Sequence, residues 1–89
     1  MRIKVEDVLT ISGEKYTVLD SILYEDKDYI LTNKVVNDGP SEIFISYEVS
    51  NDGLYIVKEK RILDRILPIF SNNINKKIME ITNKEEVNT

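Results

Sequence analysis

The chain has 89 residues, of which 42% are apolar and 31% charged, and its net charge is −4. This composition predicts one small folded domain and is too apolar for a disordered chain. The sequence contains no His and no Cys, which excludes disulfides, the common zinc sites and the Ser-His and Cys-His nucleophile pairs. The first residues lack the apolar core of a signal peptide, and no apolar run approaches the roughly 20 residues that span a bilayer, so we expect a cytoplasmic protein.

The first part of the chain alternates apolar and polar residues with the period of β-strands. A short apolar run over residues 5–11 ends at a turn signal over residues 12–15, and residues 16–24 resume the alternation, which predicts a hairpin. In this second strand Leu19 and Leu23 fall in the otherwise polar set. The strand is therefore expected to be covered on both faces, as in a curved or closed sheet.

Three further strands follow the polar break at residues 25–28. The third covers residues 29–36 and precedes a strong loop signal at residues 37–41, which contain Gly39 and Pro40. The fourth shows the clearest alternation, with apolar side chains at every second position from Ile43 to Val49. The turn signal Asn51-Asp52-Gly53 then predicts a fifth strand over residues 54–57.

From about Lys60 the apolar residues recur at steps of three and four, which predicts an amphipathic helix lying on the sheet. Pro68 falls inside this pattern, and because proline removes one helical hydrogen bond and clashes with the preceding turn, we expect a kink there. Residues 83–89 show no periodicity and are expected to form a flexible tail. The predicted organisation is a single domain over residues 1–82 followed by this tail.

The densest group of acidic side chains consists of Glu25, Asp26 and Asp28, flanked by Tyr24 and Tyr29. Their spacing does not fit a calcium loop, since no glycine and no closing glutamate stand at the required positions. We therefore predict no bound metal and no cofactor. Tyrosine is a favoured contact residue in protein interfaces, so these five residues are the predicted partner-binding site.

A second candidate site is the basic group Lys58, Lys60, Arg61 and Arg65 at the start of the helix. Clustered Lys and Arg side chains contact phosphates, and strand tyrosines can stack on bases, so a nucleic-acid-binding module is one alternative. The overall negative charge disfavours it. Solvated charges on the outer face of the helix and cross-strand packing of the tyrosines are the simpler interpretations.

Two stretches resemble small proteins of low-GC Gram-positive bacteria and their phages that contain DUF1292-like or SH3-like β-modules. The first runs from Val5 to Leu31 and includes Gly13-Glu14-Lys15-Tyr16-Thr17-Val18-Leu19 and Tyr24-Glu25-Asp26-Lys27-Asp28-Tyr29. The second is Arg65-Ile66-Leu67-Pro68-Ile69-Phe70-Ser71-Asn72-Asn73. The resemblance implies the fold, and the group has no assigned activity. The chain lacks the strongly acidic character of typical DUF1292 members.

Together these patterns predict an α+β fold: a five-stranded, curved, mainly antiparallel sheet, of the kind found in a partial SH3-like barrel, with a kinked C-terminal helix over its open face. A set of apolar residues is expected to form the core: Val8, Val18, Leu31, Ile43, Ile45, Tyr47, Val49, Ile56, Ile62, Ile66, Phe70 and Ile74.

The leading functional hypothesis is a non-enzymatic protein-interaction module that binds another protein. A narrower version is a phage- or mobile-element-encoded inhibitor, whose carboxylates at Glu25, Asp26 and Asp28 occupy a basic groove of a host or defence enzyme. Nucleic-acid binding, a homodimeric structural protein and a small hydrolase that uses carboxylates are the alternatives. The homodimer would form through an edge strand or through a helix with more apolar surface than one sheet can cover.

Overall fold

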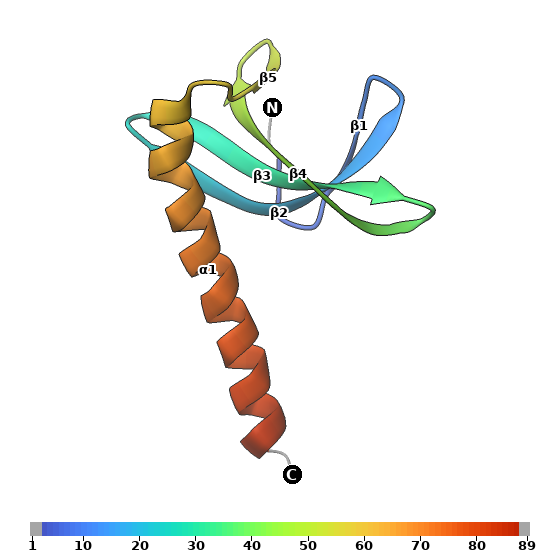
Figure 1. Ribbon diagram of the computed structural model, residues 1–89, viewed down its shortest axis with the longest axis vertical. Helices are drawn as coiled ribbons and strands as arrows, with labels where there is room; N and C mark the ends of the chain where they lie inside the picture. The colour runs from blue at the N-terminus through green and yellow to red at the C-terminus, as the bar shows by residue number, and fades with distance from the viewer. Residues whose placement is uncertain (1–2, 88–89) are drawn as a thin grey trace.

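The computed structural model describes the backbone of residues 3–87 and the side chains of residues 3–78. It contains one antiparallel sheet, whose strands neighbour one another in chain order, and a helix that crosses one face of the sheet (Figure 1). The elements are β1 (Val8–Ile11), β2 (Glu14–Tyr24), β3 (Lys27–Val36), β4 (Gly39–Ser50), β5 (Gly53–Ile56) and α1 (Lys60–Val87). The predicted α+β class and the curved antiparallel sheet are confirmed. The likeness to an SH3 barrel stays a prediction.

Two-residue turns connect the first four strands. The turns Ser12-Gly13, Glu25-Asp26 and Asn37-Asp38 all have positive φ at both residues, the conformation whose twist matches that of paired strands. The third turn is shorter than the loop predicted over residues 37–41, because Gly39 and Pro40 already belong to β4. Proline is tolerated there because β5 pairs only with the last four residues of β4, so the outer edge of β4 is unpaired at Pro40.

A bulge in β2 changes which face of the sheet its side chains occupy. Val18 pairs with Thr32, but Asp20 pairs with Leu31, so Leu19 is an extra residue in the ladder. Before the bulge Val18 lies on the face away from the helix, and after it Ile22 lies on the helix face. This explains why both alternate sets of the second strand are apolar, as the sequence indicated.

The core consists of two clusters, one on each face of the sheet, and β3 contributes to both. Tyr29 and Leu31 pack against Ile66 and Phe70 of α1, whereas Ile30 packs on the opposite face. On that opposite face, the inner face of the curved sheet, Ile30 joins Val18 and Tyr47. Of the predicted core residues, Val18, Leu31, Tyr47, Ile66 and Phe70 are buried, and Ile45, Val49, Ile62 and Ile74 are partly buried.

Three predicted core residues are wrong: Val8, Ile43 and Ile56 are 59%, 46% and 51% exposed. Val8 and Ile56 lie on the short edge strands β1 and β5, where the sheet ends and no element covers the side chain. Ile43 lies in an irregular part of β4 that departs from the regular ladder. Alternation in the sequence identified the inward face of β4, whose Ile45, Tyr47 and Val49 share one cluster, but it did not show how far the sheet extends to cover each position.

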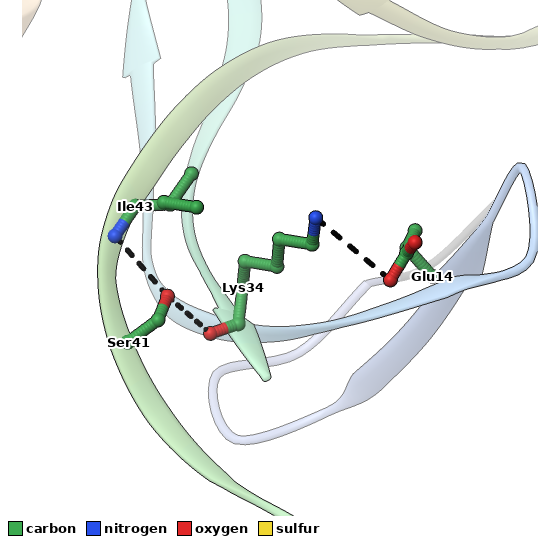
Figure 2. A network of polar contacts seen from close by, with 4 residues as sticks. All are labelled: Glu14, Lys34, Ser41 and Ile43. Carbon is green, nitrogen blue, oxygen red and sulfur yellow. Dashed lines mark hydrogen bonds and ion pairs between the residues drawn. The ribbon is translucent and has the colours of Figure 1, made fainter. Parts of the chain in front are cut away.

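The irregular part of β4 is held by side-chain hydrogen bonds in place of ladder bonds. Between the pairs Asn33 with Phe44 and Val35 with Pro40, β3 has one residue and β4 has three. The Asn33 amide donates to the carbonyl oxygens of Ser41 and Ile43 at 2.8 and 3.1 Å. Figure 2 shows the Ser41 hydroxyl donating to the Lys34 carbonyl oxygen at 2.7 Å and accepting from the Ile43 amide at 3.1 Å. Among the described residues, no buried side-chain nitrogen or oxygen is left without a hydrogen-bond partner, so these bonds satisfy the polar side chains of the irregular segment.

Helix α1 continues through Pro68, and the expected kink is not present. Pro68 is exposed, so the carbonyl that loses its helical partner can bond to water. The residues packed on the sheet, Ile62, Ile66, Phe70 and Ile74, lie on both sides of Pro68 and contact the same cluster. This shared contact holds the two parts of the helix in line. Helical backbone also extends to Val87, into the segment expected to be a tail, whose flexibility stays a prediction.

We predict that Phe70→Ala lowers the free energy of unfolding by about 3–5 kcal/mol, because it leaves a cavity between α1 and β3. Val8→Ala, which removes an apolar side chain of the exposed edge strand, should cost about 1 kcal/mol or less. Urea unfolding followed by circular dichroism measures both. Similar losses for the two variants would contradict the position of the core.

Candidate functional site

A groove lies where the β2–β3 turn, the β4–β5 hairpin and the first turn of α1 meet. Its volume is about 310 Å³. In Figure 1 this is the end of the molecule where the start of α1 stands close to the β2–β3 turn and to β5. The groove brings together segments that are up to 37 residues apart, from Glu25 to Ile62. It is therefore a product of the fold and not of one local motif.

The walls of the groove carry equal numbers of acidic and basic side chains. They are Glu25, Lys27, Glu48, Lys58, Glu59 and Arg61. Within this set, the Lys27 ammonium and the Glu48 carboxylate form an ion pair at 3.5 Å. Because both partners are partly exposed, this ion pair adds little stability. The groove is thus close to neutral overall but strongly polar along its length.

The floor of the groove is apolar and is built on Tyr29. The Tyr29 ring is 3% exposed and packs among Val57, Ile62 and the buried residues of α1. Burial is the main cause that raises the pKa of Tyr29 above its ordinary value, and the carboxylate of Glu48 adds to it. Its hydroxyl is therefore neutral and available as a donor or acceptor at physiological pH.

One side of the groove is a strained turn. Glu25 and Asp26 have φ values of 50° and 65°, and this left-handed conformation costs a residue such as Glu about 1–2 kcal/mol relative to the right-handed region. Gly, Asn and Asp are the residues that such a turn prefers. The stability of the hairpin therefore does not explain why residue 25 is Glu. Glu25 lines the groove.

The other side of the groove is the N-terminal end of α1, where the helix dipole is positive. The first turn of the helix contains no acidic residue, and Lys58 and Arg61 stand beside it. Cations near this end destabilise a helix by a few tenths of a kcal/mol each. Lys60 has a local acidic partner, since its ammonium bonds Asp64 at 2.9 Å. Glu59, whose backbone carbonyl accepts from the amides of Ile62 and Leu63, places a carboxylate at the same helix end and favours the dipole. Lys58 and Arg61 therefore do not add to the stability of the helix, whereas Glu59 does.

At the rim of the groove, hydrogen bonds orient Tyr55. Its hydroxyl donates to the carboxylate of Asp52 at 2.8 Å, and the Ser50 hydroxyl donates to the same carboxylate at 2.7 Å. These bonds lower the pKa of Asp52, and the bond to Asp52 raises the pKa of Tyr55. The half-exposed aromatic ring is thus held in place by the β4–β5 hairpin.

The groove joins parts of both candidate sites that the sequence indicated. Glu25 and Tyr29 of the first set line it together with Lys58 and Arg61 of the second. A neighbouring hollow is lined by Tyr24, Glu25, Ile62, Arg61 and Arg65. The two predicted sites are therefore one continuous surface of mixed charge.

Three of the predicted site residues, Asp26, Asp28 and Lys60, do not line the groove or the neighbouring hollow. Asp28 pairs with Val49, whose side chain lies in the cluster on the inner face, so Asp28 is on the side of the sheet opposite Tyr29. Asp26 occupies the exposed turn, and Lys60 is paired with Asp64. The acidic trio consequently does not form one patch.

The strand tyrosines do not form a stacking surface. Tyr16, Tyr29 and Tyr47 are buried, and the rings of Tyr16 and Tyr47 pack edge to face, with centroids 6.3 Å apart. Only Tyr55 exposes half of its surface. Packing across strands is therefore the role of Tyr16 and Tyr47, whereas Tyr29 packs against α1.

Sequence reasoning missed Lys27, Glu48, Glu59 and Tyr55 as site residues. Glu48 lies in the polar set of a strand with clear alternation, and only the pairing of Glu48 with Tyr29 shows that this set faces the groove. No local signal marks these residues. The register between β3 and β4 is the information that was needed.

Within the described residues, no group of three His, Cys, Asp or Glu side chains is arranged to hold a metal ion. The helical backbone that the structure describes is nowhere long and apolar enough to cross a membrane. Comparisons with protein-family models, with curated proteins and with solved structures found no match. The resemblance to DUF1292-like and SH3-like modules stays a prediction.

We predict that the stability of the protein falls above about pH 10 partly through Tyr29. The pKa of Tyr29 is raised in the folded state, so as the pH rises the unfolded chain loses this proton first. The stabilisation is fully present below the unfolded pKa of about 10 and is lost as the pH rises to the folded pKa. Urea midpoints measured from pH 7 to pH 11 test this. Tyr29→Phe should lose less stability over the alkaline range than the wild type, and an identical decline would contradict the prediction.

Proposed function

We propose that the protein is a non-enzymatic interaction module that binds a segment of another protein in the groove between α1 and the β2–β3 turn. The observation that carries the proposal is the groove itself, with an apolar floor, a fixed aromatic rim residue and walls of both charges. Protein interfaces combine an apolar centre that contains tyrosine or arginine with a polar rim. Arg61 and Tyr55 are the side chains with this character here.

The charges of the groove indicate the kind of segment it fits. On the helix side Lys58 and Arg61 outnumber Glu59 beside the positive end of α1, whereas on the sheet side Glu25 and Glu48 outnumber Lys27. A partner segment with an acidic group toward the helix and a basic group toward the sheet would be complementary to both walls. Lys58 and Arg61 beside the positive helix end and Glu25 in the left-handed turn do not stabilise the fold, so a role in recognition accounts for these three residues better than a structural one.

The nucleic-acid alternative has less support. A phosphate backbone requires a continuous surface of Lys and Arg, but Glu25, Glu48 and Glu59 lie among the basic residues of the groove. The buried tyrosines also provide no platform for bases. Protein binding is favoured for these two reasons.

The inhibitor of a host or defence enzyme is a narrower form of the same proposal. Glu25 can face a basic partner from the groove, but Asp28 lies on the other side of the sheet and cannot join it. An inhibitory function would therefore depend on Glu25 and Glu48 more than on the acidic trio. The identity of the captured partner decides between an inhibitor and another kind of binding module.

The test is affinity capture of the tagged full chain from lysate of its own host, with and without nuclease. We expect one protein to be recovered in stoichiometric amount despite nuclease, and Arg61→Glu to reduce its recovery roughly tenfold, equivalent to about 1.4 kcal/mol. This substitution adds a fourth carboxylate to the groove but favours the helix dipole, so the fold should be retained.

Lys76→Glu is the matched control, because it makes the same change of charge at an exposed position of α1 outside the groove. It should bind like the wild type. Equal recovery with all three proteins would contradict the assignment of the groove. Recovery that nuclease abolishes would favour nucleic-acid binding instead.

A further inference from the structure

Three side chains stand in a row across the sheet at the floor of the groove. The strand register places Tyr29 of β3 directly opposite Glu48 of β4, and Glu48 directly opposite Tyr55 of β5. All three residues line the groove. Directly opposed residues of antiparallel strands have Cβ atoms about 4.5–5.5 Å apart. One carboxylate residue therefore stands between two tyrosines.

The hydroxyl of Tyr29 is a polar group that the fold leaves without a partner. Tyr29 is 3% exposed, and no hydrogen bond joins its hydroxyl to another described residue. Every fully buried side-chain nitrogen or oxygen of the described residues has a partner, so the Tyr29 oxygen is not sealed in the core and opens into the groove that this residue lines. The hydroxyl of a buried tyrosine usually has a hydrogen-bond partner. Its free hydroxyl therefore marks a position at which an atom of a ligand can bond.

The surroundings of this hydroxyl are acidic, although the groove as a whole is balanced. Burial is the largest cause that raises the pKa of Tyr29, and the carboxylates of Glu48, Glu25 and Glu59 add to it. Among the described cations, Lys27 alone acts in the opposite direction. Its ammonium contacts one Glu48 oxygen at 3.5 Å, and its side chain is 60% exposed. The floor of the groove therefore favours a cationic group of a ligand.

We propose that the partner segment presents an arginine, whose guanidinium enters the groove, pairs with the Glu48 carboxylate and donates to the Tyr29 hydroxyl. The Tyr55 ring, which its bond to Asp52 holds in place, packs against the planar guanidinium. This inference rests on the function proposed for the groove, and it names the side chain that the sheet side of the groove recognises.

The number and arrangement of acceptors favour arginine over lysine. The Glu48 carboxylate, the Tyr29 hydroxyl and the Glu25 carboxylate come from β4, β3 and the β2–β3 turn. A guanidinium offers five donors in one plane and stacks on an aromatic face, whereas an ammonium is a compact charge with three donors. The ammonium of Lys27 makes one contact with Glu48, at 3.5 Å, which is longer than a charge-assisted hydrogen bond. A guanidinium can therefore use acceptors that the lysine of this chain leaves free.

Titration of the isotope-labelled full chain with N-acetyl-arginine amide tests the site, with the backbone amide shifts of Glu48 and Tyr55 as the readout. A ligand of about 15 non-hydrogen atoms is expected to bind in the millimolar range. N-acetyl-citrulline amide has nearly the same shape without the charge, and N-acetyl-lysine amide has the charge without the planar group. Both should bind at least about fivefold more weakly. Equal binding of either compound, or no shifts in the groove with the arginine amide, would overturn the proposal.

Substitutions assign the individual contacts. Glu48→Gln and Tyr29→Phe should each weaken binding of the arginine amide about fivefold. Lys27→Gln should strengthen it about twofold, because the competing cation is removed. Glu42→Gln is the matched control, since it neutralises an exposed carboxylate of β4 outside the groove, and it should bind like the wild type. Equal weakening by Glu42→Gln and Glu48→Gln would overturn the assignment.

The arginine site and the proposed function fail in different ways. If the arginine amide does not bind while Arg61→Glu still reduces capture of a partner, the arginine inference is wrong and the proposed function stands. If the arginine amide binds as expected but no protein is captured, the guanidinium site stands and the proposed function is wrong.

Discussion

The structure depends on the contact between Ile66 and Phe70 of α1 and Tyr29 and Leu31 of β3, all of which are buried. This contact fixes the helix on the sheet, and the hydrogen bond from the Asn73 amide to the buried Asp20 carboxylate, 2.9 Å long, fixes its rotation. The start of α1 is thereby held beside the β2–β3 turn. The groove exists because of this placement, and Tyr29 belongs to both the core and the groove floor.

Periodicity identified the features that depend on local sequence. The alternation from Ile43 to Val49 and the helical spacing from Ile62 to Ile74 predicted one strand and one helix correctly. The bulge at Leu19 was visible only as a strand with apolar residues in both alternate sets. The rearrangement around Asn33 could not be predicted from the sequence. There the side-chain amide of Asn33 bonds carbonyl groups eight and ten residues further along the chain, in place of ladder hydrogen bonds.

The candidate site was predictable in its parts but not in its assembly. The sequence indicated Glu25 and Tyr29 as one site and Lys58 and Arg61 as another. Their meeting in one groove follows from the path of the chain between β3 and α1. That meeting changes the chemistry, because an acidic patch and a basic patch would each attract partners of one sign, whereas the mixed surface selects for a partner with both.

The most direct measurement of the central claim is photo-crosslinking at two matched aromatic positions in the native host. Tyr55 at the groove rim and Phe44 on β4 are 51% and 57% exposed, and each is replaced in turn by a photoreactive phenylalanine analogue. Binding in the groove predicts a discrete cross-linked protein from position 55 and none from position 44. Equal products at the two positions, or a product from position 44 alone, would show that the partner binds elsewhere.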